Sequence, residues 1–193
     1  AIVGGENSFH DTMKGLDISM TVSGFVRRPQ HNKFNAGDVL IGVKSSGLHA
    51  NGFTTVRRVF GTKMREEFTR PTAIYWDFVF PVLSHCRIRG MAHITGGAFT
   101  KLKELLDGTD AVIFHPKKLK PQKIFYELYR RGISDTAMYS TFNCGIGFIL
   151  STPPGDARFI LRTLKDTAII GKVVTGNGGV IICSAFSGRM VNF

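Results

Sequence analysis

The sequence lacks the features that mark membrane, fibrous and secreted proteins. In 193 residues no apolar run approaches the ~18 residues that a membrane-spanning helix needs. It has no heptad tract, collagen period or internal repeat. The first residues lack the basic region and apolar core of a signal peptide, so we expect none. A hydrophobic content of 43% excludes a disordered chain, and the length suits one domain, or one domain with an extra piece of another.

Cysteine is scarce, and its spacing excludes the usual cysteine-based scaffolds. Cys86, Cys144 and Cys183 are odd in number and far apart, and no C-x-x-C occurs. This pattern disfavours a disulfide framework or a zinc cluster and favours reduced thiols in a cytoplasmic protein. We expect Cys144 to be a small buried residue rather than a nucleophile.

Acidic residues are also few, with 14 Asp and Glu against 25 Lys and Arg. A surplus of +11 favours anionic partners such as phosphorylated metabolites, nucleic acid or acidic lipid. The basic residues are spread out, without a run of five or an aromatic–basic ribonucleoprotein motif. We therefore expect solvated basic faces or a small anionic ligand, and no nucleic acid or membrane partner.

Apolar patterning predicts strands that mix with helices without strict alternation. This favours an α+β fold in which helices flank a mixed β-sheet in layers. The expected strands are 16–26, 39–43, 91–95, 111–114, 145–150 and 169–174 paired with 180–183. The expected helices begin at Phe53, lie within 74–83, span 99–106, run from Pro121 to a cap at Gly132, and pass through Phe159 and Leu164.

Three segments, at 45–52, 93–97 and 142–147, are predicted to share one plan, in which an apolar strand is followed by a loop of glycine and small polar residues. Glycine lets a backbone approach a ligand closely, and a loop that enters a helix, as the first two do, presents N–H groups suited to phosphate. The alternative is that they are ordinary turns. No P-loop or Rossmann fingerprint supports nucleotide binding.

Two histidines in these loops are candidates for chemistry. His49 and His93 could donate to a phosphate or transfer a proton near neutral pH, or could only orient their own loops. Asn51 and Asn143 could bind a ligand or cap a turn.

The order of the motifs resembles that of aminoimidazole ribonucleotide synthetase, the phosphoribosylformylglycinamidine cyclo-ligase or PurM family. The resemblance covers about residues 37–174, most of the chain. Gly4-Gly5-Glu6 is also similar to the end of that family's first domain. The motifs that carry it are Gly37–Gly42, Ser45–Gly52, Arg70–Tyr75, Met91–Gly97 and Thr141–Gly147.

The resemblance implies an ATP-dependent ring closure in purine biosynthesis. ATP would phosphorylate the formyl amide oxygen of formylglycinamidine ribonucleotide, and the amidine nitrogen would then close the imidazole ring. Mg²⁺ would accompany ATP, and the enzyme would be a homodimer with its active site between two α/β domains. Residues 1–30 would be a remnant of the amino-terminal ATP-binding domain and 31–193 the carboxy-terminal domain. A chain without an initiator Met that begins in this way is expected to start inside a longer protein and to be inactive alone.

Carried over position by position, the resemblance makes His49 and His93 the catalytic candidates. Glu6 and Asn7 would contact the nucleotide, and no metal ligand is assigned. The substrate-binding candidates are Ser46, Gly47, Asn51, Gly52, Thr95, Gly96, Gly97, Asn143 and Gly145.

Some positions depart from the family pattern. Ala50 replaces a serine, and Asn7 to Phe9 are more similar to formylglycinamidine ribonucleotide amidotransferase. The alternatives are therefore a related activity of the same superfamily (amidotransferase, selenide, hydrogenase-maturation or thiamine-phosphate type) or a non-catalytic module that keeps the fold.

Overall fold

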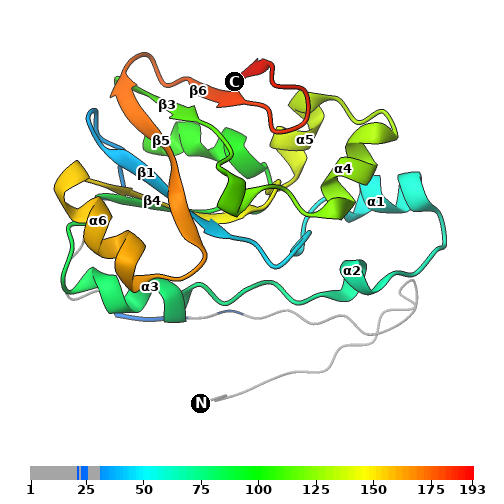
Figure 1. Ribbon diagram of the computed structural model, residues 1–193, viewed down its shortest axis with the longest axis horizontal. Helices are drawn as coiled ribbons and strands as arrows, with labels where there is room; N and C mark the ends of the chain where they lie inside the picture. The colour runs from blue at the N-terminus through cyan, green and yellow to red at the C-terminus, as the bar shows by residue number, and fades with distance from the viewer. Residues whose placement is uncertain (1–20, 22, 26–30) are drawn as a thin grey trace.

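The computed structural model describes residues 21, 23–25 and 31–193, in which one seven-stranded sheet is flanked by helices (Figure 1). The spatial strand order is β2-β4-β1-β5-β3-β6-β7, and only the β3–β6 pair is parallel. This confirms the expected α+β class. The strands are β1 (Val39–Lys44), β2 (Gly90–His93), β3 (Thr109–Ile113), β4 (Ile146–Thr152), β5 (Thr167–Thr175), β6 (Val180–Cys183) and β7 (Met190–Asn192).

The helices are short, and within the described residues none is long and apolar enough to cross a bilayer. The sequence patterns did not predict α2, α5, η2 or β7, which have only three to seven residues each. The expected strand at 16–26 falls mostly outside the described residues. The helices are α1 (Phe53–Phe60), α2 (Glu66–Thr69), α3 (Trp76–Leu83), α4 (Lys123–Arg130), α5 (Asp135–Thr141) and α6 (Pro154–Thr163), with the 3₁₀ helices η1 (Ala98–Leu105) and η2 (Lys117–Leu119).

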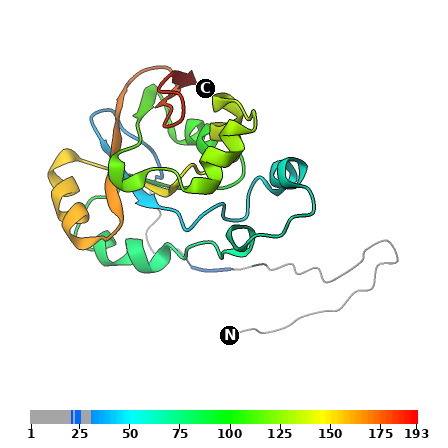
Figure 2. The same ribbon diagram turned by 45° about the vertical axis from the view of Figure 1, so that its right-hand side comes forward.

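Alternating strand residues separate two hydrophobic cores, one on each face of the sheet. Leu40 of β1 joins the larger core, with η1, α4 and α5, through residues such as Phe99 and Leu128. Its neighbour Ile41 joins the smaller core with Val79 of α3 and α6. Figures 1 and 2 show α3 and α6 together, apart from α4 and α5. The sheet is thus the middle layer of three.

The predicted pairing of 169–174 with 180–183 is wrong, because β3 lies between β5 and β6 and pairs with both. The reason is the Asp110 carboxylate, whose Oδ1 accepts the backbone N–H groups of Asn177 at 2.8 Å and Gly179 at 2.7 Å. These bonds hold the 175–179 connection across the start of β3, so it cannot form a tight hairpin.

Two helix predictions also need correction. Pro121 is not the first helical residue: Gln122 occupies the N-cap and α4 begins at Lys123. Lys120, before the proline, is extended, which is the conformation that a following proline favours. The 99–106 segment forms the 3₁₀ helix η1. Gly132, in contrast, has the positive φ of 93° expected of a residue that ends a helix.

Candidate functional site

The three predicted loops meet at one edge of the sheet. The loop at 45–52 follows β1 and the loop at 93–97 follows β2. The loop at 142–145 precedes β4 instead of following a strand, which corrects the common plan predicted for all three. Because β4 runs antiparallel to both β1 and β2, its beginning lies beside their ends. The antiparallel pairing therefore brings together loops that are nearly a hundred residues apart in the sequence.

Asn143 ties two of the loops together from a buried position. Its Nδ2 donates to the carbonyl oxygen of Gly47 at 2.8 Å, and its Oδ1 accepts the N–H of Gly145 at 2.9 Å. The Gly145 carbonyl in turn accepts the N–H of Ser45 at 2.9 Å. The amide of Asn143 thus bonds to backbone and holds the loops in place.

The third loop joins the same cluster. The N–H of Ile94 donates to the carbonyl oxygen of Gly147 at 2.9 Å. The Asn51 side chain lies beside Gly96, since a Cβ there would stand 3.8 Å from Asn51 Oδ1. Gly52 and Gly97 take positive φ angles at the N-caps of α1 and η1. The loops at 45–52 and 93–97 therefore lead into helices, as predicted; Thr95 lies within the second.

His49 is buried and faces its own loop. Its Nε2 accepts the backbone N–H of Ser46 at 3.2 Å, and the residue has a positive φ of 59°. Burial, and secondarily the nearby His93, lowers the pKa of His49 to about 4. The ring is therefore neutral at pH 7, with its proton on Nδ1. Within the described residues that buried Nδ1 has no hydrogen-bond partner.

His93 lies close to His49 but is exposed. It ends β2, and its ring centroid stands 6.0 Å from that of His49 and 5.3 Å from that of Tyr75. Desolvation lowers the pKa of His93 as well. A neutral, accessible imidazole can accept or pass on a proton, so of the two predicted catalytic histidines His93 has the geometry for that task.

Tyr75 completes this cluster, although the sequence analysis did not single it out as a site residue. Its hydroxyl donates to the carbonyl oxygen of Lys44 at 3.1 Å, and its ring stacks on Phe148 at 5.2 Å. A Cβ at Gly147 would stand 1.8 Å from the Tyr75 hydroxyl and 2.7 Å from His49 Cε1. Glycine is needed at 147 because both side chains pack directly on the strand.

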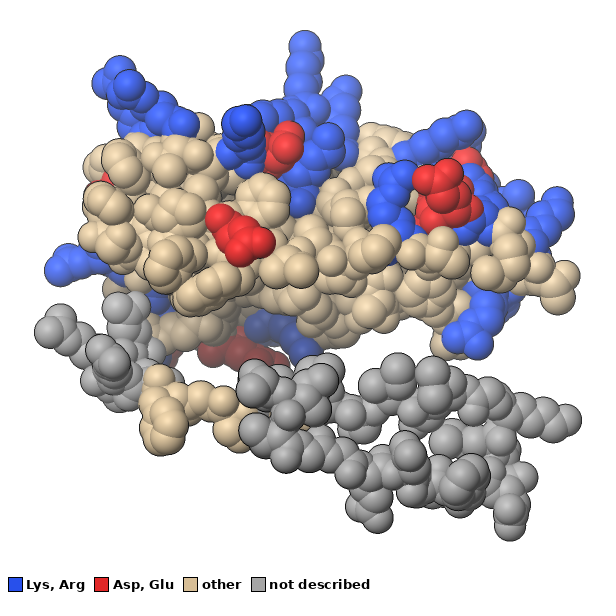
Figure 3. Space-filling view, turned by 90° about the horizontal axis from the view of Figure 1, so that it is seen from below, with Lys and Arg blue, Asp and Glu red and all other residues tan. Residues whose placement is uncertain are grey.

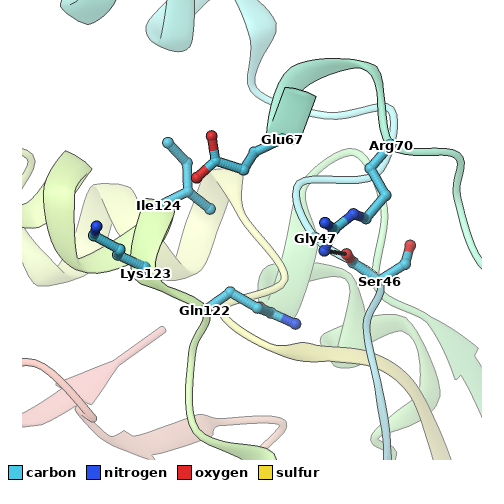
Figure 4. Close-up of a pocket in the computed structure, with 7 residues that line it drawn as sticks. All are labelled: Ser46, Gly47, Glu67, Arg70, Gln122, Lys123 and Ile124. Carbon is cyan, nitrogen blue, oxygen red and sulfur yellow. Dashed lines mark hydrogen bonds between the residues drawn. The ribbon is translucent and has the colours of Figure 1, made fainter. Parts of the chain in front are cut away.

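A small open cavity lies beside the Ser46–Gly47 turn (Figure 4). Its volume is about 200 Å³, below the roughly 300–1,000 Å³ of pockets for drug-sized ligands. Apart from Ser46 and Gly47, none of the residues that line it was predicted from the sequence to belong to a site, although Arg70 begins the motif at 70–75. It is lined by Ser46, Gly47, Glu67, Arg70, Gln122, Lys123 and Ile124.

The remaining candidates are placed as follows. Cys144 is fully buried and burial raises the pKa of its thiol, which confirms the expectation of an inert small residue. Glu6 and Asn7 lie outside the described residues.

In the described part of the chain no three His, Cys, Asp or Glu residues gather as metal ligands. The described residues therefore contain no cluster of such side chains that could hold a metal ion alone, whereas Mg²⁺ that accompanies ATP needs only one or two carboxylates from the protein.

Comparison with known proteins identifies the family. The family model described as AIR synthase related protein, C-terminal domain, matches residues 35–184. A phosphoribosylformylglycinamidine cyclo-ligase of Methanocaldococcus jannaschii is 36% identical over 95% of this chain and 60% of its own length. The cyclo-ligase of Methanobrevibacter smithii is 34% identical over 100% of this chain and 62% of its own. The chain thus spans about six tenths of the length of these curated relatives.

Solved structures agree on the fold. The hydrogenase maturation protein HypE superposes with a TM-score of 0.62 at 17% identity, over 87% of this chain and 56% of HypE. HypE in complex with ATP superposes with a TM-score of 0.55 at 14% identity, over 85% of this chain and 52% of that one. Because the family model matches well over half of the sequence, the chain belongs to the family of AIR synthase related proteins and contains their C-terminal domain.

Proposed function

We propose that this chain is part of a phosphoribosylformylglycinamidine cyclo-ligase. We also propose that it binds the phosphoribosyl substrate where the loops at 45–52, 93–97 and 142–145 meet. The observation that carries the proposal is the convergence of the loops at 45–52, 93–97 and 142–145 around His49 and His93. These loops match the motifs that resemble the family, and the curated relatives carry this enzyme name. The substrate-binding residues remain those that the sequence predicted.

The reaction is an ATP-driven ring closure. The formyl amide oxygen of the substrate takes the γ-phosphoryl group of ATP, and ADP is released. The amidine nitrogen then attacks the activated carbon and forms the new C–N bond. The same nitrogen loses a proton, and the C–O bond breaks so that phosphate leaves. We assign the acceptance of that proton to His93, which is neutral and exposed. His49 positions the Ser46 turn.

The ATP-binding residues are proposed to lie mostly outside 31–193, with Glu6 and Asn7 among them. Residues 1–30 are accordingly assigned to the end of an amino-terminal domain, and the whole enzyme is proposed to be a homodimer. HypE, which shares the fold, has been solved with ATP. The motif resemblance supports the proposal that the whole enzyme also binds ATP.

The test has two stages. Calorimetry should show that this chain binds formylglycinamidine ribonucleotide more tightly than formylglycinamide ribonucleotide, the substrate of the amidotransferase alternative. A chain completed with the amino-terminal part of the M. jannaschii cyclo-ligase should then convert it to aminoimidazole ribonucleotide with release of ADP, whereas the chain alone should not.

Substitution of His93 provides the control within the second stage. In the completed chain, His93→Gln should lower kcat by about 10²-fold or more and change KM little, because general acid–base catalysis contributes on that scale. Preference for the amide over the amidine ribonucleotide, or binding without product in the completed chain, would contradict the cyclo-ligase assignment.

A further inference from the structure

We propose that Arg70 binds the phosphate of the phosphoribosyl substrate in the cavity beside the Ser46–Gly47 turn. This inference rests on the proposed function, and it adds the orientation of the substrate: phosphate at the α4 side of the loops and the reacting end toward His93. It also assigns a binding residue that lies outside the predicted set.

Arg70 is held at the cavity by its contacts with the turn. Its Nη1 donates to the carbonyl oxygen of Ser46 at 3.3 Å, and the Ser46 hydroxyl donates to the carbonyl oxygen of Pro71 at 2.7 Å. Figure 4 shows the guanidinium directed from the end of α2 toward Ser46 and the middle of the cavity. The first bond places the guanidinium next to a predicted substrate loop, and the second ties the backbone that follows Arg70 to the same turn.

Much of the donor capacity of Arg70 remains available. Among the described residues its other nitrogens donate no hydrogen bond, and its only ion pair is a 3.7 Å contact with the exposed Glu66. An exposed pair at that distance is weak and is screened by salt. A planar guanidinium with free N–H groups suits a phosphate, which it can bind through two parallel hydrogen bonds.

The carboxylate in the cavity wall is neutralised by a separate arginine. Both oxygens of Glu67 accept from Arg65 at 2.9 Å, and Arg65 also donates to Glu127 at 2.6 and 3.3 Å. The Arg65 guanidinium lies 5.2 Å from the ring centroid of Phe60, which fixes it further. Both carboxylate oxygens of Glu67 are thus occupied by Arg65. Arg70 is the charged group that faces the cavity.

The opposite wall of the cavity is the beginning of α4. Gln122 donates to the carbonyl oxygen of Ser45 at 2.7 Å, and its side chain makes no capping bond to the helix. The N-terminal end of α4, at Gln122, Lys123 and Ile124, therefore borders the cavity with its partial positive charge uncapped. This wall adds to the attraction of an anion that Arg70 binds.

Lys123 lines the cavity but does not turn its charge toward it. In Figure 4 its ammonium group points away from Arg70 and Ser46. The hydrogen bond from Arg65 is the main cause that lowers the pKa of Glu127, one turn further along α4, and the charge of Lys123 adds to that effect. Lys123 therefore provides a matched control: a cation of the same cavity wall that is not expected to contact the phosphate.

Basic side chains are dispersed over the face that Figure 3 shows. Figure 3 shows Lys and Arg side chains projecting at several separate places on one face of the described residues. Attraction of a small anion to one defined place therefore requires a local arrangement such as the Arg70 cavity, because spread charges act only over a screened distance of ~8 Å in physiological salt.

The experiment titrates ribose 5-phosphate and ribose against this chain and its variants by calorimetry. The unsubstituted chain should bind ribose 5-phosphate more tightly than ribose, and higher salt should weaken only the phosphate-dependent part. Arg70→Gln should weaken ribose 5-phosphate binding about tenfold or more, since charge-assisted bonds are lost. Arg70→Lys should fall between, because it keeps the charge but loses the planar fork.

Two controls separate a binding role from a structural one. Lys123→Gln should change ribose 5-phosphate affinity less than about threefold, because its ammonium lies away from the space. Thermal unfolding should place Arg70→Gln close to the unsubstituted chain, since Arg70 makes one exposed hydrogen bond. An unchanged affinity in Arg70→Gln, or an equal loss in Lys123→Gln, would overturn the proposal.

The same titrations distinguish this inference from the proposed function. If ribose 5-phosphate binds in an Arg70-dependent manner but formylglycinamidine ribonucleotide does not bind, the function fails and the anion cavity stands. If the ribonucleotide binds equally well to Arg70→Gln, the cavity fails and the function stands. All the residues that line the cavity lie within 46–124. If ribose 5-phosphate fails to bind the unsubstituted chain, the proposed phosphate site is therefore also contradicted.

Discussion

His49 Nε2 accepts the backbone N–H of Ser46, three residues earlier in the chain, at 3.2 Å. This bond closes the turn between β1 and α1 around a buried imidazole, while the neighbouring His93 remains exposed. The two histidines that the sequence placed in one category therefore differ in their surroundings. One is arranged to hold the loop, and the other is arranged to meet a ligand.

Substitution of each histidine should separate these roles. His49→Ala should lower the free energy of unfolding by about 1–3 kcal/mol, because it leaves the Ser46 N–H without its acceptor. His93→Ala should change it by no more than about 0.5 kcal/mol, as is usual for an exposed side chain. Urea unfolding measures both. Equal losses in the two variants would contradict the distinction.

Stability should fall in acid over a defined range. Unfolded histidine has a pKa of 6.5, whereas burial lowers the pKa of folded His49 to about 4. Between these pH values the unfolded chain binds more protons than the folded chain. The stability that neutral His49 contributes is therefore fully present above pH ~6.5 and is lost as the pH falls toward ~4. His115, whose pKa burial also lowers to about 4, acts in the same direction.

Urea unfolding between pH 4 and 7.5 tests this expectation. His49→Gln should reduce the slope of unfolding free energy against pH below 6.5, since one of the contributing groups is removed. A steeper fall in His49→Gln than in the unsubstituted chain would show that the sign is wrong.

Asn143 should be among the more sensitive polar positions. Asn143→Ala removes the 2.8 Å bond to the Gly47 carbonyl and the 2.9 Å bond from the Gly145 N–H. Buried groups left without partners cost about 1–3 kcal/mol each, so we expect a loss of at least about 2 kcal/mol in unfolding free energy. The exposed Asn177→Ala should be close to neutral. A neutral Asn143→Ala would mean that the loops do not depend on this amide.

Gly147→Ala should disrupt the aromatic cluster. The added Cβ would stand 1.8 Å from the Tyr75 hydroxyl, so the tyrosine and His49 must shift, and such overpacking costs about 1–3 kcal/mol. Tyr75→Phe in the same chain should restore part of the loss, because it removes the nearest atom. Gly155→Ala, where nothing lies within 4 Å of the new Cβ, should be tolerated. Calorimetric melting compares the three.

Much of the fold follows from local patterns. The apolar runs at 39–43 and 145–150 locate β1 and β4, two interior strands, since a strand that is buried on both faces needs apolar residues throughout. The glycines at 52 and 97 mark where loops enter helices, because a positive φ at those positions favours glycine. The ordered motifs also indicated the family that the comparison confirmed.

Long-range pairing was decided only by the tertiary structure. No local pattern shows that β3 separates β5 from β6, because the bonds from the 175–179 connection to Asp110 span more than sixty residues. The same holds for Arg70, which became a candidate only when its guanidinium was seen beside Ser46. Residue type and spacing state what a side chain can do, but not which distant group it meets.

The sequence by itself therefore determined the family, all the sheet-forming segments of the described residues except β7, and the three loops. Only the tertiary structure decided that His49 is buried while His93 is exposed. The physical reason is that both are imidazoles near glycine turns, and their protonation and access depend on how much surrounding chain excludes water from each. His49 packs against Gly147, whereas His93 ends β2, the strand at the edge of the sheet.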